Sequence, residues 1–221
     1  MKNLLITALA SALLLGCHVD SIYTGSAEKA FFADVRAGNL QGVKKFLDDG
    51  GRVNMQDEQG CTPLFWAVAD DFKGSHREMV ALLIARGADV NAVDDIQTAP
   101  LHMASNKETA ELLSSARNAA NASKTWAMYL GLVELLIAKG ADVNVKDHVG
   151  KTTLHVAAQQ FDEKRASEIC EWLIANGARV NEEDATGLTP LDDALTHQRT
   201  ETAEVLRKHG GKTAQEENDH D

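Results

Sequence analysis

The sequence predicts an all-α protein built from five repeated helix-loop-helix units, because three markers recur in one register. A glycine follows an apolar segment at Gly50, Gly87, Gly140, Gly177 and Gly210, at intervals of 37, 53, 37 and 33 residues. A Val-Asn pair lies a few residues after each of the first four glycines, and an aspartate lies three residues beyond each Asn, at Asp57, Asp94, Asp147 and Asp184. Self-similarity at a period of roughly 20–50 residues is the signature of a repeat architecture.

Each marker has a physical role in the predicted unit. The run from Met79 to Ile84 presents a broad apolar face at helical period, and the glycine after it can adopt the left-handed conformation that ends a helix. Asp57 and Gly60 supply turn chemistry. Thr62-Pro63 and Thr189-Pro190 place an N-cap residue before a proline at the first helical position. Each unit therefore reads as a hairpin turn, a helix, a loop and a second helix.

With these motifs the sequence resembles the ankyrin-repeat family. The resemblance covers about Ala30 to Gly211 and is carried by Thr62-Pro63-Leu64, Pro100-Leu101-His102, Leu154-His155-Val156-Ala157, Thr189-Pro190-Leu191 and two Gly-Ala-Asp-Val-Asn runs. It implies an ankyrin-repeat solenoid of five helix-loop-helix repeats joined by β-hairpin turns. Phe65 and Asp192 replace the usual His of the motif, and we expect each change to weaken a local cap or a hydrogen bond between repeats.

Three repeats are longer than the 33-residue period of the last one. The extra lengths are 4, 20 and 4 residues, each between the first and second helix of its repeat. The largest insertion, at about 106–130, is rich in alanine and contains no proline, so we expect longer helices there, broken near 118–123. We assign residues 27–211 to the repeat domain and expect an acidic, disordered tail over 212–221.

The first residues predict an export signal and a lipid anchor. Lys2 precedes an uncharged run from Leu4 to Leu15, which is shorter than the about 20 residues that cross a bilayer and fits a signal peptide over 1–16. Leu14-Leu15-Gly16-Cys17 resembles the lipobox of bacterial lipoproteins, which implies lipidation of Cys17 and a tether over 17–26. His18 in place of Asp favours the periplasmic face of the outer membrane over the inner membrane. The alternative is a plain secretory signal with an incidental cysteine.

Composition narrows the classes of function. The formal net charge is −11, which disfavours nucleic-acid binding and suits a basic protein partner. Three separated cysteines suggest neither a disulfide framework nor a zinc site; we expect Cys61 to lie exposed on a hairpin and Cys170 to be a core residue. His102 and His155 are expected to join neighbouring repeats by hydrogen bonds. We predict no metal, no cofactor, no catalytic residues and a monomer.

In the ankyrin-repeat family the partner usually meets the hairpin tips and the concave surface of the first helices. Ile96, Val149 and Leu188 would add an apolar strip edged by acids. Transferred position by position, together with aromatic residues of the expansions, the predicted partner-binding set is Glu58, Gln59, Asp70, Phe72, Asp95, Ile96, Thr98, Ser105, Asn106, His148, Val149, Lys151, Gln159, Gln160, Phe161, Thr186, Leu188 and His197.

The resemblances together imply a lipid-anchored periplasmic protein that binds and regulates a protein partner. Ankyrin-type lipoproteins include immunity proteins that neutralise secretion-system toxins such as lipases, so this is the first expectation. The alternative is a periplasmic scaffold for oxidative stress, for which dependence on Cys61 would be diagnostic. An enzyme, the alternative of another class, would require a cluster of perturbed acids or histidines in a deep pocket.

Overall fold

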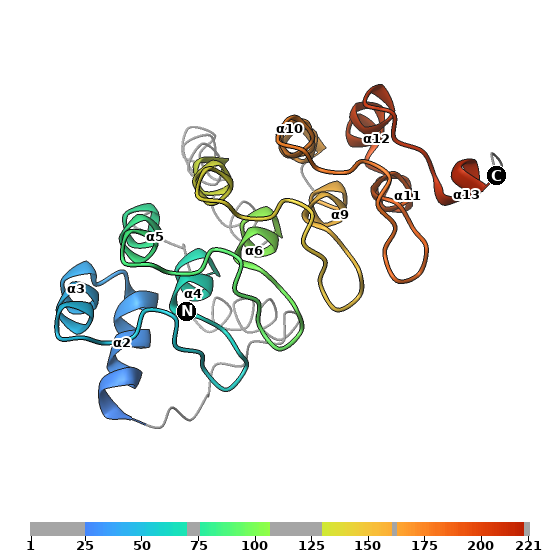
Figure 1. Ribbon diagram of the computed structural model, residues 1–221. Coiled ribbons are helices and arrows are strands. Elements are labelled where there is room, and N and C mark those ends of the chain that lie inside the picture. The colour runs from blue at the N-terminus through green and yellow to red at the C-terminus, as the bar shows by residue number, and fades with distance from the viewer. Residues whose placement is uncertain (1–24, 70–75, 107–129, 161–162, 219–221) are drawn as a thin grey trace, which may run out of the picture. The chain divides into compact units, whose positions relative to one another are not determined.

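The computed structural model describes residues 25–69, 76–106, 130–160 and 163–218 (Figure 1). The chain divides into two compact units: unit 1 comprises residues 1–104 and 110–140, and unit 2 comprises residues 105–109 and 141–221. The expected signal peptide over 1–16, Cys17 and most of the tether lie outside the described residues. So does the central insertion from 107 to 129.

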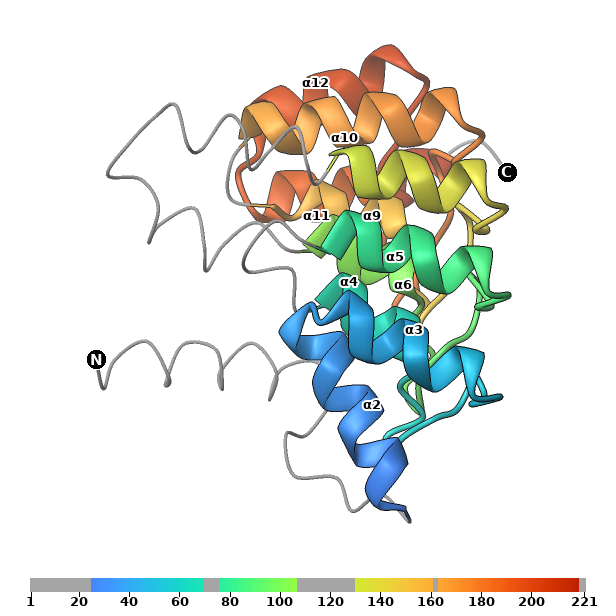
Figure 2. The same cartoon turned by 90° about the vertical axis from the view of Figure 1, so that its left-hand side faces the viewer.

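Unit 1 contains α2 (Ser26–Ala37), α3 (Leu40–Asp48), α4 (Pro63–Ala69), α5 (His76–Ala85), most of α6 (Pro100–Asn106) and a helix over 130–138. The start of α3 is fixed by Asn39, whose side chain accepts the N–H of Gly42 at 3.2 Å. The start of α4 is fixed by Thr62, whose hydroxyl accepts the N–H of Phe65 at 3.2 Å, as the Thr-Pro motif predicts. Figure 2 shows the second helices α3 and α5 side by side.

Unit 2 contains α9 (Thr153–Ala158), α10 (Glu163–Ala175), α11 (Pro190–Thr196), α12 (Thr200–Lys208) and α13 (Ala214–Asn218). The first helices α9 and α11 pack against each other, as do the second helices α10 and α12. Thr189 caps α11 and is followed by a proline at the first helical position, which the sequence also predicts. Within the described ranges the hairpin turns form one isolated antiparallel bridge, Lys146–Thr152, and no longer strand.

Each unit has its own apolar core. In unit 1 the fully buried side chains include Phe31, Phe65 and Met79, and in unit 2 they include Leu154, Leu173 and Leu191. Cys170 is a buried free thiol, as predicted. The five glycines of the repeat marker all have φ between 83° and 93°, a conformation that favours glycine and ends each second helix.

Two expectations about the cysteines and the C-terminus are wrong. Cys61 is 0% exposed rather than exposed on its hairpin, because it lies at the base of the tip beside the buried residues Thr62 and Leu64. Residues 212–218 are not a disordered tail. The contacts that hold helix α13 include Ala214 N–H to Asp192 at 2.8 Å, Asn181 to Glu217 at 2.8 Å and Arg207 to Glu216 at 3.2 Å.

The substitution of Asp192 for the usual His also behaves differently from the expectation. Its carboxylate accepts the backbone N–H of Thr189 at 3.0 Å, while the Thr189 hydroxyl accepts the N–H of Asp192 at 3.3 Å. This reciprocal pair is a capping box. Asp192 therefore maintains the cap of α11 and also anchors α13, because a carboxylate can accept several hydrogen bonds at once.

Candidate protein-interaction site

The hairpin tips are shaped by the repeated aspartates. In unit 2, Asp147 accepts the backbone N–H groups of Val149 at 3.0 Å and Lys151 at 2.8 Å. Asp184 likewise accepts the N–H groups of Thr186 at 2.8 Å and Leu188 at 3.1 Å. One carboxylate thus orders the whole turn, since it pairs N–H groups that a short loop leaves without strand partners.

The pKa of Asp184 reflects this arrangement. Burial of the carboxyl acts to raise its pKa, but hydrogen bonds from the Thr186 hydroxyl and from the N–H groups of Leu188 and Thr186 outweigh burial and hold the pKa below the ordinary value of 3.8. Asp184 is therefore ionised at neutral pH. Its charge is used within the turn, not offered to a partner.

Neighbouring tips are also joined to each other. The N–H of Ala185 donates to the carbonyl of Val149 at 2.9 Å in unit 2, and the N–H of Asp95 donates to the carbonyl of Gln59 at 2.9 Å in unit 1. Gly150 allows the close approach, since a Cβ there would lie 2.5 Å from the Ala185 nitrogen. Side chains on the tips consequently project from a backbone that is already ordered, which lowers the entropic cost of binding.

A ladder of asparagines links the base of each repeat to the next. The side-chain amide of Asn144 donates to the carbonyl of Gly177 at 3.0 Å, and its oxygen accepts the N–H of Arg179 at 2.9 Å. Asn54 makes the same two bonds to Gly87 and Asp89. The Val-Asn marker of the sequence therefore corresponds to a joint between repeats.

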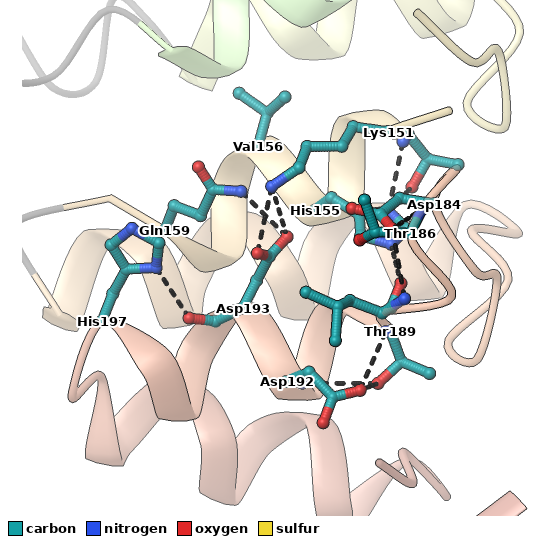
Figure 3. Close-up of polar contacts among 12 residues, drawn as sticks. Lys151, His155, Val156, Gln159, Asp184, Thr186, Thr189, Asp192, Asp193 and His197 are labelled. Carbon is teal, nitrogen blue, oxygen red and sulfur yellow. Dashed lines mark hydrogen bonds and ion pairs between the residues drawn. The ribbon is translucent and has the colours of Figure 1, made fainter. Parts of the chain in front are cut away.

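Three predicted site residues of unit 2 meet at Asp193 on α11, two at its buried carboxylate and one at its backbone carbonyl (Figure 3). The Lys151 ammonium lies 3.0 and 3.1 Å from its two oxygens, and the Gln159 amide donates to it at 2.8 Å. The His197 ring lies against the Asp193 backbone carbonyl, with Nδ1 at 2.9 Å. Asp193 is 3% exposed, whereas the Lys151 side chain is 23% exposed. This ion pair joins the fourth repeat to the fifth and leaves a polar surface above it.

His155 has the structural role that the sequence predicts. Its Nδ1 accepts the N–H of Thr152 at 3.1 Å, which assigns the proton to Nε2, and Nε2 then donates to the carbonyl of Leu188 at 3.1 Å. Burial lowers the pKa of His155 below 6.5, although the bond to Leu188 and the charges of Asp193 and Asp184 oppose this. His102 is also buried, and its Nδ1 accepts the Ala99 N–H at 3.1 Å.

The predicted binding residues differ in how much of the side chain a partner could reach. Four are partly covered: Gln59, Ile96, Lys151 and Gln159. Seven are exposed: Glu58, Asp95, His148, Val149, Thr186, Leu188 and His197. Of the proposed apolar strip, Ile96 belongs to unit 1, whereas Val149 and Leu188 belong to unit 2.

Three predicted contact residues are buried, which corrects the prediction. Thr98 is 7% exposed, Ser105 is 1% exposed and Gln160 is 5% exposed. Thr98 donates its backbone N–H into its own hairpin, to Asp94 at 2.7 Å. The Gln160 amide turns back onto the Val156 carbonyl at 2.8 Å. These side chains are buried within the repeats, so they are not accessible to a partner.

The remaining predictions lie outside the described residues. They are Asp70, Phe72 and Phe161, together with the side chain of Asn106. The sequence prediction also missed one exposed apolar residue, Leu195, which is 47% exposed near the end of α11. The sequence feature that could have revealed it is the large side chain of Leu195 at a repeat position that holds Val68, Ser105 and Ala158 in the earlier repeats.

The described part of the chain lacks two kinds of functional feature, a metal-binding cluster and a membrane-spanning helix. Among its residues there is no group of three or more His, Cys, Asp or Glu side chains arranged to hold a metal ion. Over the same ranges, none of the helices combines the length and apolar character needed to cross a membrane.

The helix pairs, ordered tips and asparagine joints define a repeat protein whose surface is suited to contact another protein. The chain belongs to the ankyrin-repeat family: a family model described as "Ankyrin repeats (3 copies)" matches residues 30–125 and 122–217. The predicted fold class, an all-α ankyrin-repeat solenoid, is thereby confirmed. Ankyrin repeats are protein-protein interaction modules and are typically non-enzymatic, so the chain is an interaction scaffold.

Among curated proteins, the chain is similar to transient receptor potential cation channel subfamily A member 1 of Homo sapiens. The two are 26% identical over an alignment of 178 residues, and the match covers 65% of this chain. The match spans only 14% of the length of that channel protein. The similarity therefore concerns the repeats that both chains contain.

Proposed function

We propose that this protein is a lipid-anchored scaffold of the bacterial periplasm that captures a basic protein partner through its hairpin tips. The sharper form of the proposal is an immunity protein that neutralises a secretion-system toxin such as a lipase. The observation that carries it is the set of ordered tips, on which Val149 is 40% exposed although its backbone is fixed by Asp147 and Ala185. The fold has no use for an apolar side chain there.

Binding to such a surface requires little reorganisation of the scaffold. The tip hydrogen bonds are already made, so an incoming protein can bury Val149 without paying to order the loop around it. The exposed residues on the two joined tips of unit 2 include the polar His148 and Thr186. An apolar centre with a polar rim is the usual anatomy of an interface between proteins.

The choice of a basic partner rests on charge. The chain carries 33 acidic and 22 basic residues. Such a net negative charge would accelerate encounter with a positively charged protein and slow it at high ionic strength. Inhibition of a lipase at the membrane also agrees with the proposed anchor at Cys17, because the anchor would hold the inhibitor where the toxin meets its lipid substrate.

The binding test uses a purified basic periplasmic lipase toxin, for which the neighbouring gene names the first candidate. We expect a complex with the full chain and loss of lipase activity on mixing. The double variant Ile96→Asp with Val149→Asp should weaken binding at least about tenfold, or about 1.4 kcal/mol. A matched control is Ala81→Asp with Ala85→Asp, which places the same two charges on exposed positions of α5.

Two results would count against the proposal. If the toxin neither binds nor is inhibited, the immunity role is wrong. If the tip variant loses thermal stability while its affinity is unchanged, the tips are scaffold and not a binding surface. The anchor is tested separately: radiolabelled palmitate should be incorporated by the wild type and not by Cys17→Ser, and equal labelling would refute lipidation at Cys17.

A further inference from the structure

The last repeat has an uncovered apolar residue where earlier repeats are covered. Leu195 occupies the position filled by Val68, Ser105 and Ala158 in the three repeats before it, which are 0%, 1% and 0% exposed. In unit 2 the reason is visible, since Ala158 lies on α9 and α9 packs against α11 of the next repeat. Leu195 lies on α11 itself, and it is 47% exposed.

Leu188 repeats this pattern on the hairpin. It stands directly after the turn glycine, at the position of Cys61 and Lys151 in earlier repeats. Cys61 is 0% exposed, and the Lys151 side chain is 23% exposed because it reaches over Asp193 of the following repeat. Leu188 is 38% exposed. Both leucines thus stand where a following repeat would pack.

Helix α13 covers only part of this end of unit 2. Figure 1 shows α9, α11 and α13 in a row, so that α13 stands where a further first helix would be. Two of the contacts that hold this segment are made near the start of α11, where the Ala214 N–H donates to Asp192 and the Thr189 hydroxyl donates to the Lys212 carbonyl oxygen at 2.7 Å. Because α13 has five residues, Leu195 at the other end of α11 stays uncovered.

The charge around these leucines distinguishes between possible occupants. Asp192, Glu216 and Glu217 lie on or beside α13, and Asp219 and Asp221 follow it in the sequence. The bases Arg207 and Lys212 are already paired, with Glu216 at 3.2 Å and Glu217 at 3.3 Å. A second copy would bring the same acids and another net charge of −11 to the contact. A basic segment of another protein meets no such repulsion.

We propose that the end face, meaning Leu188, Leu195 and α13, is a docking surface for an amphipathic helix of a partner protein that carries basic residues beside its apolar stripe. The partner helix packs beside α13 against the part of α11 that α13 leaves uncovered, with its apolar side chains on the two leucines. Its basic residues lie near the acids of α13. This surface is separate from the tip surface at Val149 and does not depend on the partner proposed there.

The proposal is tested with a synthetic amphipathic peptide of Leu, Ala and Lys of about 16 residues, a length at which an isolated helix becomes marginally stable. The peptide is titrated by fluorescence anisotropy against the full chain carrying Cys17→Ser. We expect Leu188→Ser with Leu195→Ser to weaken binding at least about tenfold. Ala81→Ser, at an exposed position of α5 that belongs to neither proposed surface, is the control and should leave the affinity unchanged.

Two further peptides and one further measurement can contradict the proposal. A scrambled peptide of the same composition and a peptide with Glu for Lys should both bind at least about tenfold more weakly. Hydrogen exchange should show protection of α11 and α13 by the amphipathic peptide. Equal binding to the leucine variant, or to the scrambled peptide, would overturn the proposal. Sedimentation that shows a dimer dissociated by the leucine substitutions would instead assign the end face to a second copy.

Discussion

One position of the repeat is filled in opposite ways in the two units. In unit 1 it holds Trp66, which is 3% exposed, donates its indole N–H to Asp57 at 2.7 Å and lies under the Arg36 guanidinium at 4.4 Å. In unit 2 the same position holds Asp193, paired with Lys151. In both, a cation from the preceding repeat reaches this position, but it meets an aromatic ring in one case and a carboxylate in the other.

The two kinds of buried contact contribute differently to stability. A buried aromatic ring contributes apolar burial and packing to stability. A buried ion pair contributes much less net stability, because desolvation of both charges offsets their attraction, yet it is costly to break. All three large apolar side chains that the described residues expose, Val149, Leu188 and Leu195, also lie in unit 2. Among the described residues, the large exposed apolar side chains available for contact therefore lie in unit 2.

The largest expected effect comes from Trp66→Ala. Removal of a buried indole with its hydrogen bond should lower the free energy of unfolding by about 3–5 kcal/mol. Unit 2 has two repeats, with Val156 at this position of the fourth and Asp193 at this position of the fifth. Val156 is only partly buried, so Val156→Ala should cost about 1 kcal/mol or less. Chemical denaturation followed by circular dichroism measures both. Equal losses would contradict the contrast between the units.

A smaller effect is expected from Asp193→Ala. The change leaves Lys151 and the Gln159 amide without their acceptor, and because the Lys151 head group keeps some contact with water, we expect a loss of about 1–3 kcal/mol. Lys151→Met with Asp193→Leu removes both charges and should recover much of that loss. A double-mutant cycle separates the pair from its neighbours. If the double variant is as unstable as Asp193→Ala, then the ion pair is not the source of the cost.

The smallest expected effect is on the pH dependence of stability and concerns His155. Because its pKa is lowered in the folded protein, the unfolded chain binds a proton first as the pH falls. Stability should therefore decline from just above pH 6.5 down to the folded-state pKa, and His155→Gln should remove this part of the decline. Denaturation midpoints between pH 8 and pH 5 test it, and an unchanged slope in the variant would refute the assignment.

A second decline is expected at lower pH. The pKa of Asp184 lies below its ordinary value of 3.8 because of the hydrogen bonds in the hairpin, so its contribution to stability is present above about pH 4 and is lost below. This decline should persist in His155→Gln. If Asp184→Asn abolishes this decline in stability, the decline is due to the hairpin carboxylate and not to His155.

The sequence was sufficient for the scaffold because each marker has a local cause. The helix-ending glycines need positive φ, Asp147 needs only its own turn, and Thr189-Pro190 starts a helix by itself. Such features repeat with the sequence, so their positions transfer from one unit to the next. The structural role of His155 was predictable for the same reason.

Exposure was harder to predict, since it depends on the neighbouring repeat and not on the residue's own unit. Thr98, Ser105 and Cys61 were assigned to the surface by position, but they are buried. Leu195 was overlooked because its equivalents are covered. Helix α13 was missed for a related reason: its acidic composition suggests disorder, whereas its order depends on contacts with distant residues such as Asn181 and Asp192.

The asparagine ladder also bears on how such a protein can change its length. Each rung joins a side chain to backbone atoms of the next repeat, as Asn144 joins Gly177 and Arg179. The last rung follows the same rule, with Asn181 bound to the Gly210 carbonyl and the Lys212 N–H. The bonds to backbone atoms do not depend on which side chains follow the joint. Gene duplication or deletion could therefore add or remove whole repeats while these bonds between repeats are kept.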